Sequence, residues 1–305
     1  MRASATFAAR STCRGGAQLQ TDDHAALDAL FPSANRLEAW VQTLEQHWGY
    51  ALAAIALTAG FTWWCVVFGL PLAATAVARV VPASVEATLG EQTLAALDKS
   101  LCAPTALAAD RTEAVRKVFS TVTAGLDDGH TYRLELRACA QIGPNAFAMP
   151  GGAIVVTDDL VKLAQNDQEI AAVIAHETGH VRYRHGLRMA LQGAGAAALI
   201  AALAGDAVTM TKLAVLLPTV LLQSGYSREF ETEADTYAFQ RMKAIGLSPQ
   251  FFADMMLLME KQRGRPAGTA GDGKAGAPSG ASHTLDYLST HPATAERIQR
   301  ARDYR

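Results

Sequence analysis

Residues 170–180 read IAAVIAHETGH, and this segment determines the kind of domain that the chain forms. His176 and His180 are four residues apart, so on a helix both imidazoles lie on one face, where they can bind a single zinc ion. Glu177 points to the side of that metal and can act as general base toward a zinc-activated water. The preceding residues are apolar, which predicts a buried helix, and three buried polar side chains without a partner would cost several kcal/mol. A bound metal removes that cost.

A catalytic zinc needs a third protein ligand and an open fourth position. The metzincin arrangement is excluded, because the chain has Tyr183 where that spacing requires glycine and Gly186 where it requires histidine. The segment 226–235, YSREFETEAD, is the better candidate. Glu231 and Asp235 share a helical face there, so Glu231 can ligate the metal while Asp235 accepts a proton from a ligand histidine's other nitrogen. A solvated acidic helix face is the alternative interpretation of this segment alone.

Two neighbouring positions are expected to contribute less to the site. His185 lies five residues after His180 and therefore on a different helical face, which predicts a supporting or surface residue. Glu229 and Glu233 fall on faces other than that of Glu231, and we expect both to be solvated.

The composition limits the classes of protein that fit. With 305 residues, of which 50% are hydrophobic and 18% charged, the chain can form one large domain or two modest ones, and a mainly disordered chain is excluded. A net charge of −2 gives no electrostatic reason to expect nucleic acid as a partner. Four cysteines are too few for a disulfide scaffold.

The apolar residues are concentrated in one tract without charge. Tyr50–Leu70 is long enough to cross a hydrocarbon layer of about 30 Å as a helix. A buried helix of a soluble core is the alternative, but the tract lacks the polar stripe that a surface-packed helix requires. We therefore predict a cytoplasmic tail at 1–47, a transmembrane anchor at 48–78 and a catalytic domain at 79–305. An excess of arginines before the anchor mildly favours an N-terminus on the inside.

The rest of the chain alternates between helical and strand periodicities, which predicts an α+β domain, mostly helical with a small β-sheet. Residues 1–35 show no firm periodicity. Met189–Gln223 is a second apolar region, for which buried helices are preferred over a membrane-dipping hairpin. The remaining predictions, in chain order, are helices within 84–127, a strand at 131–137, a turn at 150–152, a strand at 153–157, a helix at 158–186 with Thr157 or Asp158 as N-cap, a flexible loop at 264–282 and a short helix at 293–302.

Four motifs in a fixed order resemble one family. HETGH and YSREFETEAD are accompanied upstream by NAFAMPGG, from Asn145, and downstream by HPATAERI, from His291. This set resembles the HtpX, BepA and CAAX-prenyl-protease family of zinc metallopeptidases, peptidase family M48, over about residues 80–305. The resemblance implies a zincin-like fold of the gluzincin type, one zinc ion per chain held by His176, His180 and Glu231, and Glu177 as general base. The single anchor fits the periplasmic, BepA-like branch.

The resemblance also implies roles for the flanking motifs. Asn145 can hydrogen-bond the substrate backbone just past the scissile bond. The strand at 153–157 can pair, through Ala153 and Val155, with an extended peptide as an added edge strand. His291 can donate to the developing oxyanion or occupy the fourth zinc position in a resting state, with an ordinary helix-start turn as the alternative.

Two further expectations concern the C-terminal part of the chain. The loop at 264–282 directly precedes His291, and we expect its mobility to gate that side chain and the entry of substrate. Arg297 is expected to pair with a carboxylate of the site or to face solvent.

Together these predictions describe a single-pass enzyme of a bacterial-type inner membrane, with its catalytic domain in the periplasm. The expected substrates are misfolded or unassembled envelope proteins, and the reaction is zinc-dependent hydrolysis of their peptide bonds. A metal-stabilised chaperone or assembly factor with little turnover is the alternative; a prenyl-protein protease fits less well, because one span is predicted. Cys102 and Cys139 fall on the catalytic side, where a disulfide would suit an oxidising periplasm and two free buried cysteines fit equally well.

Overall fold

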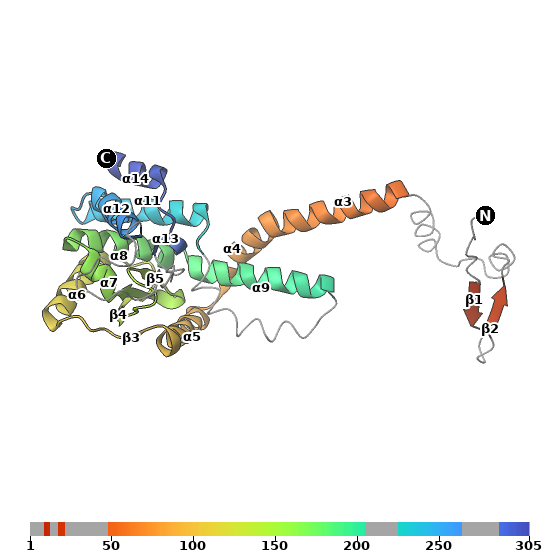
Figure 1. The fold of residues 1–305 in the computed structure, drawn as a ribbon, viewed down its shortest axis with the longest axis horizontal. Coiled ribbons are helices and arrows are strands. Elements are labelled where there is room, and N and C mark those ends of the chain that lie inside the picture. The colour runs from red at the N-terminus through yellow and green to blue at the C-terminus, as the bar shows by residue number, and fades with distance from the viewer. Residues whose placement is uncertain (1–8, 13–17, 22–47, 205–224, 264–286, 305) are drawn as a thin grey trace, which may run out of the picture. The chain divides into compact units, whose positions relative to one another are not determined.

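The structure is a computed structural model that describes residues 9–12, 18–21, 48–204, 225–263 and 287–304 (Figure 1). The chain divides into two compact units, Met1–Cys65 and Val66–Arg305. The predicted loop at 264–282 and the second half of the apolar region Met189–Gln223 lie outside the described residues.

The first unit contains a short hairpin and a helix. Strands β1 (Ala9–Thr12) and β2 (Gln18–Thr21) pair antiparallel, with Ala9 opposite Thr21. Because residues 1–35 show no firm periodicity, this hairpin was not predicted. Helix α3 (Trp48–Trp64) has no buried residue, and its large apolar side chains are exposed.

The predicted anchor tract is helical throughout. After α3 the chain continues through a π-helical turn, η1 (Cys65–Gly69), into α4 (Leu70–Val80). Pro71 lies in the first turn of α4, two residues after this π-helical turn ends. By length and composition the 33-residue helix Trp48–Val80 is a candidate membrane span, and none of its most apolar window is buried.

The second unit contains a four-stranded sheet in the order β3-β4-β6-β5. Its strands are β3 (Ala103–Pro104), β4 (Arg133–Ala138), β5 (Ala146–Ala148) and β6 (Ala153–Thr157). Strand β6 pairs parallel with β4 and antiparallel with β5. The expectation that Ala153 and Val155 belong to a strand that a peptide can extend is therefore wrong, because both sides of β6 are already paired. Strand β5, three residues long and not predicted, lies at the end of the sheet.

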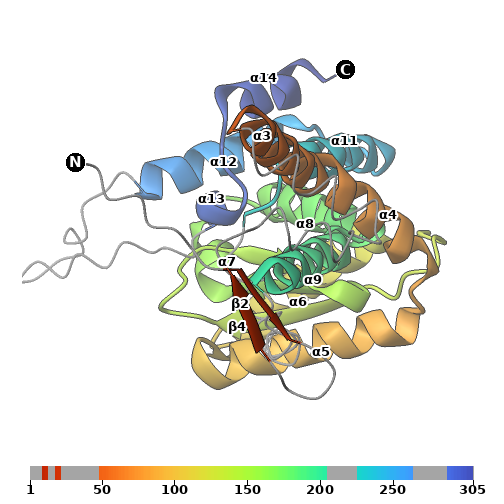
Figure 2. The ribbon, with the colours of Figure 1, turned by 90° about the vertical axis from the view of Figure 1, so that its right-hand side faces the viewer.

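Helices cover the sheet in layers, and the prediction of a mostly helical domain with a small sheet is confirmed. Helix α8 lies between the sheet strands β5 and β6 and the helices α11 and α12, as Figures 1 and 2 show. Every residue of α8 from Glu169 to Val181 is buried. The helices are α5 (Ala83–Ser100), α6 (Ala109–Thr123), α7 (Asp158–Leu163), α8 (Asp167–Arg182), α9 (His185–Ala204), α11 (Arg228–Ala244), α12 (Gln250–Arg263), α13 (Tyr287–Thr290) and α14 (Ala295–Asp303).

The prediction of a single helix at 158–186 is wrong, because the structure divides this segment among α7, α8 and the start of α9. Thr157 caps α7, as predicted, by accepting a hydrogen bond from Leu160 N. Asn166 then caps α8 by accepting from Glu169 N, which restarts the helix after a break. Helix α8 ends at Arg182, and Arg184 adopts a left-handed φ of 53° before α9 begins.

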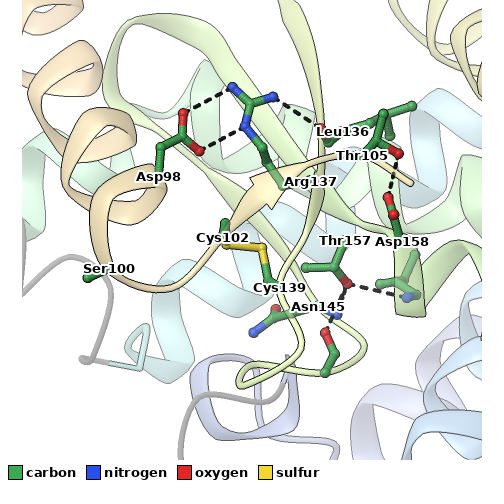
Figure 3. Close-up of a disulfide and its surroundings, with 12 residues drawn as sticks. Asp98, Ser100, Cys102, Thr105, Leu136, Arg137, Cys139, Asn145, Thr157 and Asp158 are labelled. Atoms are coloured by element: carbon green, nitrogen blue, oxygen red, sulfur yellow. Dashed lines mark hydrogen bonds and ion pairs between the residues drawn. A yellow bond between two sulfur atoms is a disulfide. The ribbon is translucent and has the colours of Figure 1, made fainter. Parts of the chain in front are cut away.

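A disulfide fixes the loop that leads to β5. Cys102 and Cys139 are bonded, with their α-carbons 4.3 Å apart, so the paired alternative is the one that the structure shows (Figure 3). Further along the same loop, the Thr157 hydroxyl donates to Gly143 O and accepts from Asn145 N. The loop between β4 and β5 is therefore held at both ends.

Candidate metal centre

The two histidines of HETGH lie on one face of α8, inside the domain. His176 and His180 are 0% and 1% exposed, and their Nε2 atoms face each other at 3.0 Å. Glu177 is 0% exposed and lies beside the pair. Gly179, directly before His180, lets helix α11 (Arg228–Ala244) pack closely against α8, because a Cβ at this position would lie only 3.0 Å from the α-carbon of Ala234.

Helix α11 brings Glu231 to the histidines. Ser227 caps this helix by accepting from Phe230 N, so that Glu231 lies in the first turn. The Glu231 carboxylate places Oε1 3.5 Å from His180 Nε2 and Oε2 3.6 Å from His176 Nε2. Two segments about fifty residues apart thus supply the three predicted ligands.

His291 completes the cluster from a third segment. Its Nδ1 lies 2.9 Å from Glu231 Oε1 and 3.3 Å from His176 Nε2. Its Nε2 points to the other side, 3.6 Å from Glu177 Oε1. One ligand atom from each of His176, His180, Glu231 and His291 lies within 4.8 Å of the other three.

The residues present fit a zinc ion. Three imidazole nitrogens and one carboxylate are the donor types that zinc prefers, and all four side chains are buried. In the described part of the chain, both carboxylate oxygens of Glu177 and Nε2 of His291 are buried without a hydrogen bond. Buried polar atoms of this kind are rare unless a ligand, water or ion satisfies them.

The charges around the cluster also favour a cation. Burial by itself would lower the pKa of His291, but the negative charges of Glu231 and Glu177 outweigh it and raise the pKa above its ordinary value. Burial lowers the pKa of His180 to about 3, so this imidazole is neutral, as a metal ligand must be. Burial would raise the pKa of Glu231, but the histidines facing it hold that pKa well below the ordinary value.

Asp235 and Arg297 lie directly behind the cluster. Asp235 Oδ1 is 3.0 Å from His176 Nδ1, the nitrogen that faces away from the other ligands. Arg297 donates to both Asp235 oxygens, from Nε at 2.8 Å and Nη2 at 2.7 Å, and its Nη1 lies 2.6 Å from Glu231 Oε2. Of the two alternatives for Arg297, the structure shows the pairing with site carboxylates.

His180 is held from behind by another histidine. Nδ1 of His185 lies 2.9 Å from Nδ1 of His180, and Nε2 of His185 lies 2.8 Å from Glu233 Oε2. Arg188 donates to the same Glu233 oxygen. The expectation that Glu233 is merely solvated is therefore wrong: the break after Arg182 turns His185 back toward His180, where Glu233 can reach it.

Two tyrosines form aromatic walls of the site. Tyr226 stacks on the His180 ring with centroids 3.9 Å apart, and Tyr287 stacks on the His291 ring at 4.4 Å. Tyr226 begins the YSREFETEAD motif, whereas no sequence pattern indicated Tyr287, which lies in a helix of only four residues.

The residues predicted to bind substrate are placed differently from the ligands. Asn145 is 0% exposed, and its Oδ1 accepts from Ala146 N at the start of β5. Ala153 and Val155 are 2% and 0% exposed inside the sheet. In this conformation all three stabilise the sheet that supports α8.

Comparison with known proteins agrees with this geometry. The family model described as Peptidase family M48 matches residues 109–305. The chain is similar to the metalloprotease LoiP of Escherichia coli, 34% identical over 165 residues, which are 52% of this chain and 58% of LoiP. It is also similar to the mitochondrial metalloendopeptidase OMA1 of Schizosaccharomyces pombe, 26% identical over 192 residues, which are 62% of this chain and 52% of that protein.

A third relative is a putative beta-barrel assembly-enhancing protease of Vibrio cholerae, 32% identical over 178 residues, which are 52% of this chain and 33% of that protein. The chain thus spans about half the length of these relatives, or less. The zinc prediction is confirmed, because the family is zinc-dependent and the cluster offers the matching donors. The chain belongs to peptidase family M48.

Proposed function

We propose that this protein is a membrane-anchored zinc endopeptidase that cleaves misfolded or unassembled envelope proteins. The observation that carries the proposal is the buried cluster of His176, His180 and Glu231 with Glu177 beside it. A purely structural metal would have no use for a buried carboxylate without a hydrogen bond at that place.

Each side chain has one task in the proposed mechanism. His176, His180 and Glu231 would hold the zinc ion, which when bound supplies Lewis-acid activation of water and of the scissile carbonyl. The Glu177 carboxylate takes a proton from the attacking water and passes it to the nitrogen of the leaving amine. Burial of Glu177 shields this exchange from bulk water.

His291 is proposed to have two positions. Its Nδ1 now lies among the other three donors, which describes a resting state without room for substrate. Once withdrawn, the same imidazole can donate to the oxyanion that develops on the carbonyl oxygen. The negative charges of Glu231 and Glu177 outweigh burial and raise the pKa of His291 above its ordinary value, which favours the protonated form that this role needs.

Substrate is proposed to bind as an extended strand. Because β6 is paired on both sides, a peptide would pair with β5, the strand at the end of the sheet next to α8. Such pairing reads the backbone more than the side chains, which suits unfolded segments. The name of the Vibrio cholerae relative, a beta-barrel assembly-enhancing protease, supports envelope proteins as substrates.

Two features support the proposed location. The exposed apolar helix Trp48–Val80 is proposed to anchor the chain in an inner membrane through residues 50–70. The disulfide Cys102–Cys139 supports an oxidising compartment and therefore favours a periplasmic catalytic domain, with residues 1–47 in the cytoplasm.

A metal-stabilised chaperone or assembly factor is the second candidate. It is favoured by His291, whose presence among the ligands closes the donor set as in structural zinc sites. The purified full-length chain should cleave unfolded casein, lose that activity with a chelator and regain it with zinc. A zinc-loaded chain that suppresses aggregation of an unfolded client but never cleaves it would replace the peptidase with the chaperone.

A further inference from the structure

Both ligand histidines are supported from behind by a carboxylate and an arginine. For His176 the support is direct: Asp235 contacts Nδ1, and Arg297 holds Asp235. For His180 the support is indirect. The carboxylate of Glu233, held by Arg188, contacts His185, and His185 in turn contacts His180.

We propose that His185 is a positioning residue of the metal centre, which fixes the ring orientation and the tautomer of His180. Glu233 and Arg188 in turn fix the tautomer of His185. This inference rests on the proposed function, because it concerns the same zinc site.

The tautomers follow from the geometry of the chain of contacts. His180 turns Nε2 toward the cluster, 3.5 Å from Glu231 Oε1. A neutral imidazole that binds a metal through Nε2 carries its proton on Nδ1. That proton is donated to His185 Nδ1, 2.9 Å away, which must therefore be an acceptor. His185 then carries its own proton on Nε2 and donates it to Glu233 Oε2 at 2.8 Å.

The ring of His185 is also fixed by packing. It is 0% exposed and stacks on Phe230 with centroids 4.2 Å apart and planes at 5°. The guanidinium of Arg188 lies 4.3 Å from the centre of the same Phe230 ring. Tyr183 also stacks on this ring, with centroids 5.6 Å apart, so packing and two polar partners together hold His185 against His180.

The backbone turn before His185 is anchored as well. Arg184, at φ 53°, donates to Val81 O at 3.0 Å and to Ala78 O at the end of α4. Its guanidinium also pairs with the buried carboxylate of Glu86. These contacts hold the chain in a turn that L-residues rarely adopt, and this turn places His185 opposite His180.

The test compares zinc affinities of the full-length chain by competition with a chromophoric chelator. His185→Phe keeps a ring on Phe230 but removes the acceptor for His180, and should weaken zinc binding about 10- to 100-fold. His185→Gln restores an acceptor oxygen and should recover most of the affinity. Glu229→Gln, an exposed change on the same helix as Glu233, is the matched control and should bind zinc as the wild type does.

A second readout separates positioning from general loss of structure. With cobalt in place of zinc, His185→Phe should shift the visible absorption bands, whereas His185→Gln should restore them. Wild-type affinity and spectrum in folded His185→Phe would overturn the inference.

If His185→Phe does not fold, as judged by far-ultraviolet circular dichroism, Glu233→Ala takes its place, since the Glu233 side chain is 37% exposed. It should weaken zinc binding in the same direction, and an unchanged affinity would overturn the inference. A wild-type chain that binds no zinc would instead refute the proposed function.

Discussion

Arg297 neutralises two buried carboxylates at once. Its side chain is 8% exposed, and it contacts Asp235 with two nitrogens and Glu231 with the third. Burial would raise the pKa of Asp235, but the hydrogen bonds from Arg297 and His176 hold it below the ordinary value. Both carboxylates therefore stay ionised, Glu231 toward the metal position and Asp235 toward His176.

Removing this cation should destabilise the domain strongly. Arg297→Met leaves two buried carboxylates without their arginine and should lower the free energy of unfolding of the metal-free protein by about 3–5 kcal/mol. Urea unfolding followed by circular dichroism measures the change. Arg302→Met, an exposed position on the same helix, is the control and should change stability little. An Arg297→Met protein within about 1 kcal/mol of the wild type would show that the carboxylates are not charged.

The ligand residues could be predicted from the sequence because their spacing is local. His176 and His180 share a helical face wherever that helix packs, and the same holds for Glu231 and Asp235. The role of His185 could not be predicted, because it depends on a left-handed residue, Arg184, that ends one helix and starts another. No rule of helical faces applies across such a turn.

At the scale of elements, the sequence predicted that β4 and β6 are strands, but not which strand lies at the edge of the sheet. The alternation of residues 131–137 and the β-branched run of β6 predicted two strands, which the structure contains as β4 and β6. The three residues of β5 are too few to show a period, yet they place β6 inside the sheet. A strand's position in a sheet depends on contacts distant in sequence, so its edges cannot be read from its own residues.

One loop contact ties the end of α8 to the sheet and should depend on pH. Asp128, before β4, accepts from the Tyr132 hydroxyl at 2.7 Å and from Arg182 at 2.8 Å. Burial would raise the pKa of Asp128, but these hydrogen bonds outweigh it and lower the pKa below its ordinary value of 3.8. A lowered folded-state pKa means that the stabilisation is present above pH 3.8 and is lost as the pH falls through the folded-state pKa.

Asp128→Asn should therefore lower the unfolding free energy by roughly 1 kcal/mol at neutral pH. The difference from the wild type should shrink in acid, below the ordinary pKa of 3.8, where the wild-type carboxyl is also becoming protonated. Urea unfolding at a series of pH values measures this difference. A difference that stays constant from neutral pH into acid would mean that the charge of Asp128 does not contribute.

At the scale of the whole molecule, the apolar helix and the metal centre have separate tasks. Large side chains such as Leu57 and Trp48 are 74% and 86% exposed, far more apolar surface than a water-soluble helix presents. We expect the full-length chain to stay in the membrane pellet after a carbonate wash. The double substitution Ile55→Arg and Leu57→Arg should shift it to the soluble fraction, because inserting a charged side chain at the centre of a membrane span costs free energy. Extraction of the wild type by carbonate would contradict the anchor.

The peptidase assignment depends on Glu177 as the base beside a metal held by other side chains. Its most direct test measures zinc content and casein cleavage of the purified full-length chain and of Glu177→Gln side by side. We expect equal zinc content and a loss of cleavage of about 100- to 10,000-fold in the variant. Cleavage by zinc-loaded Glu177→Gln at the wild-type rate would contradict it.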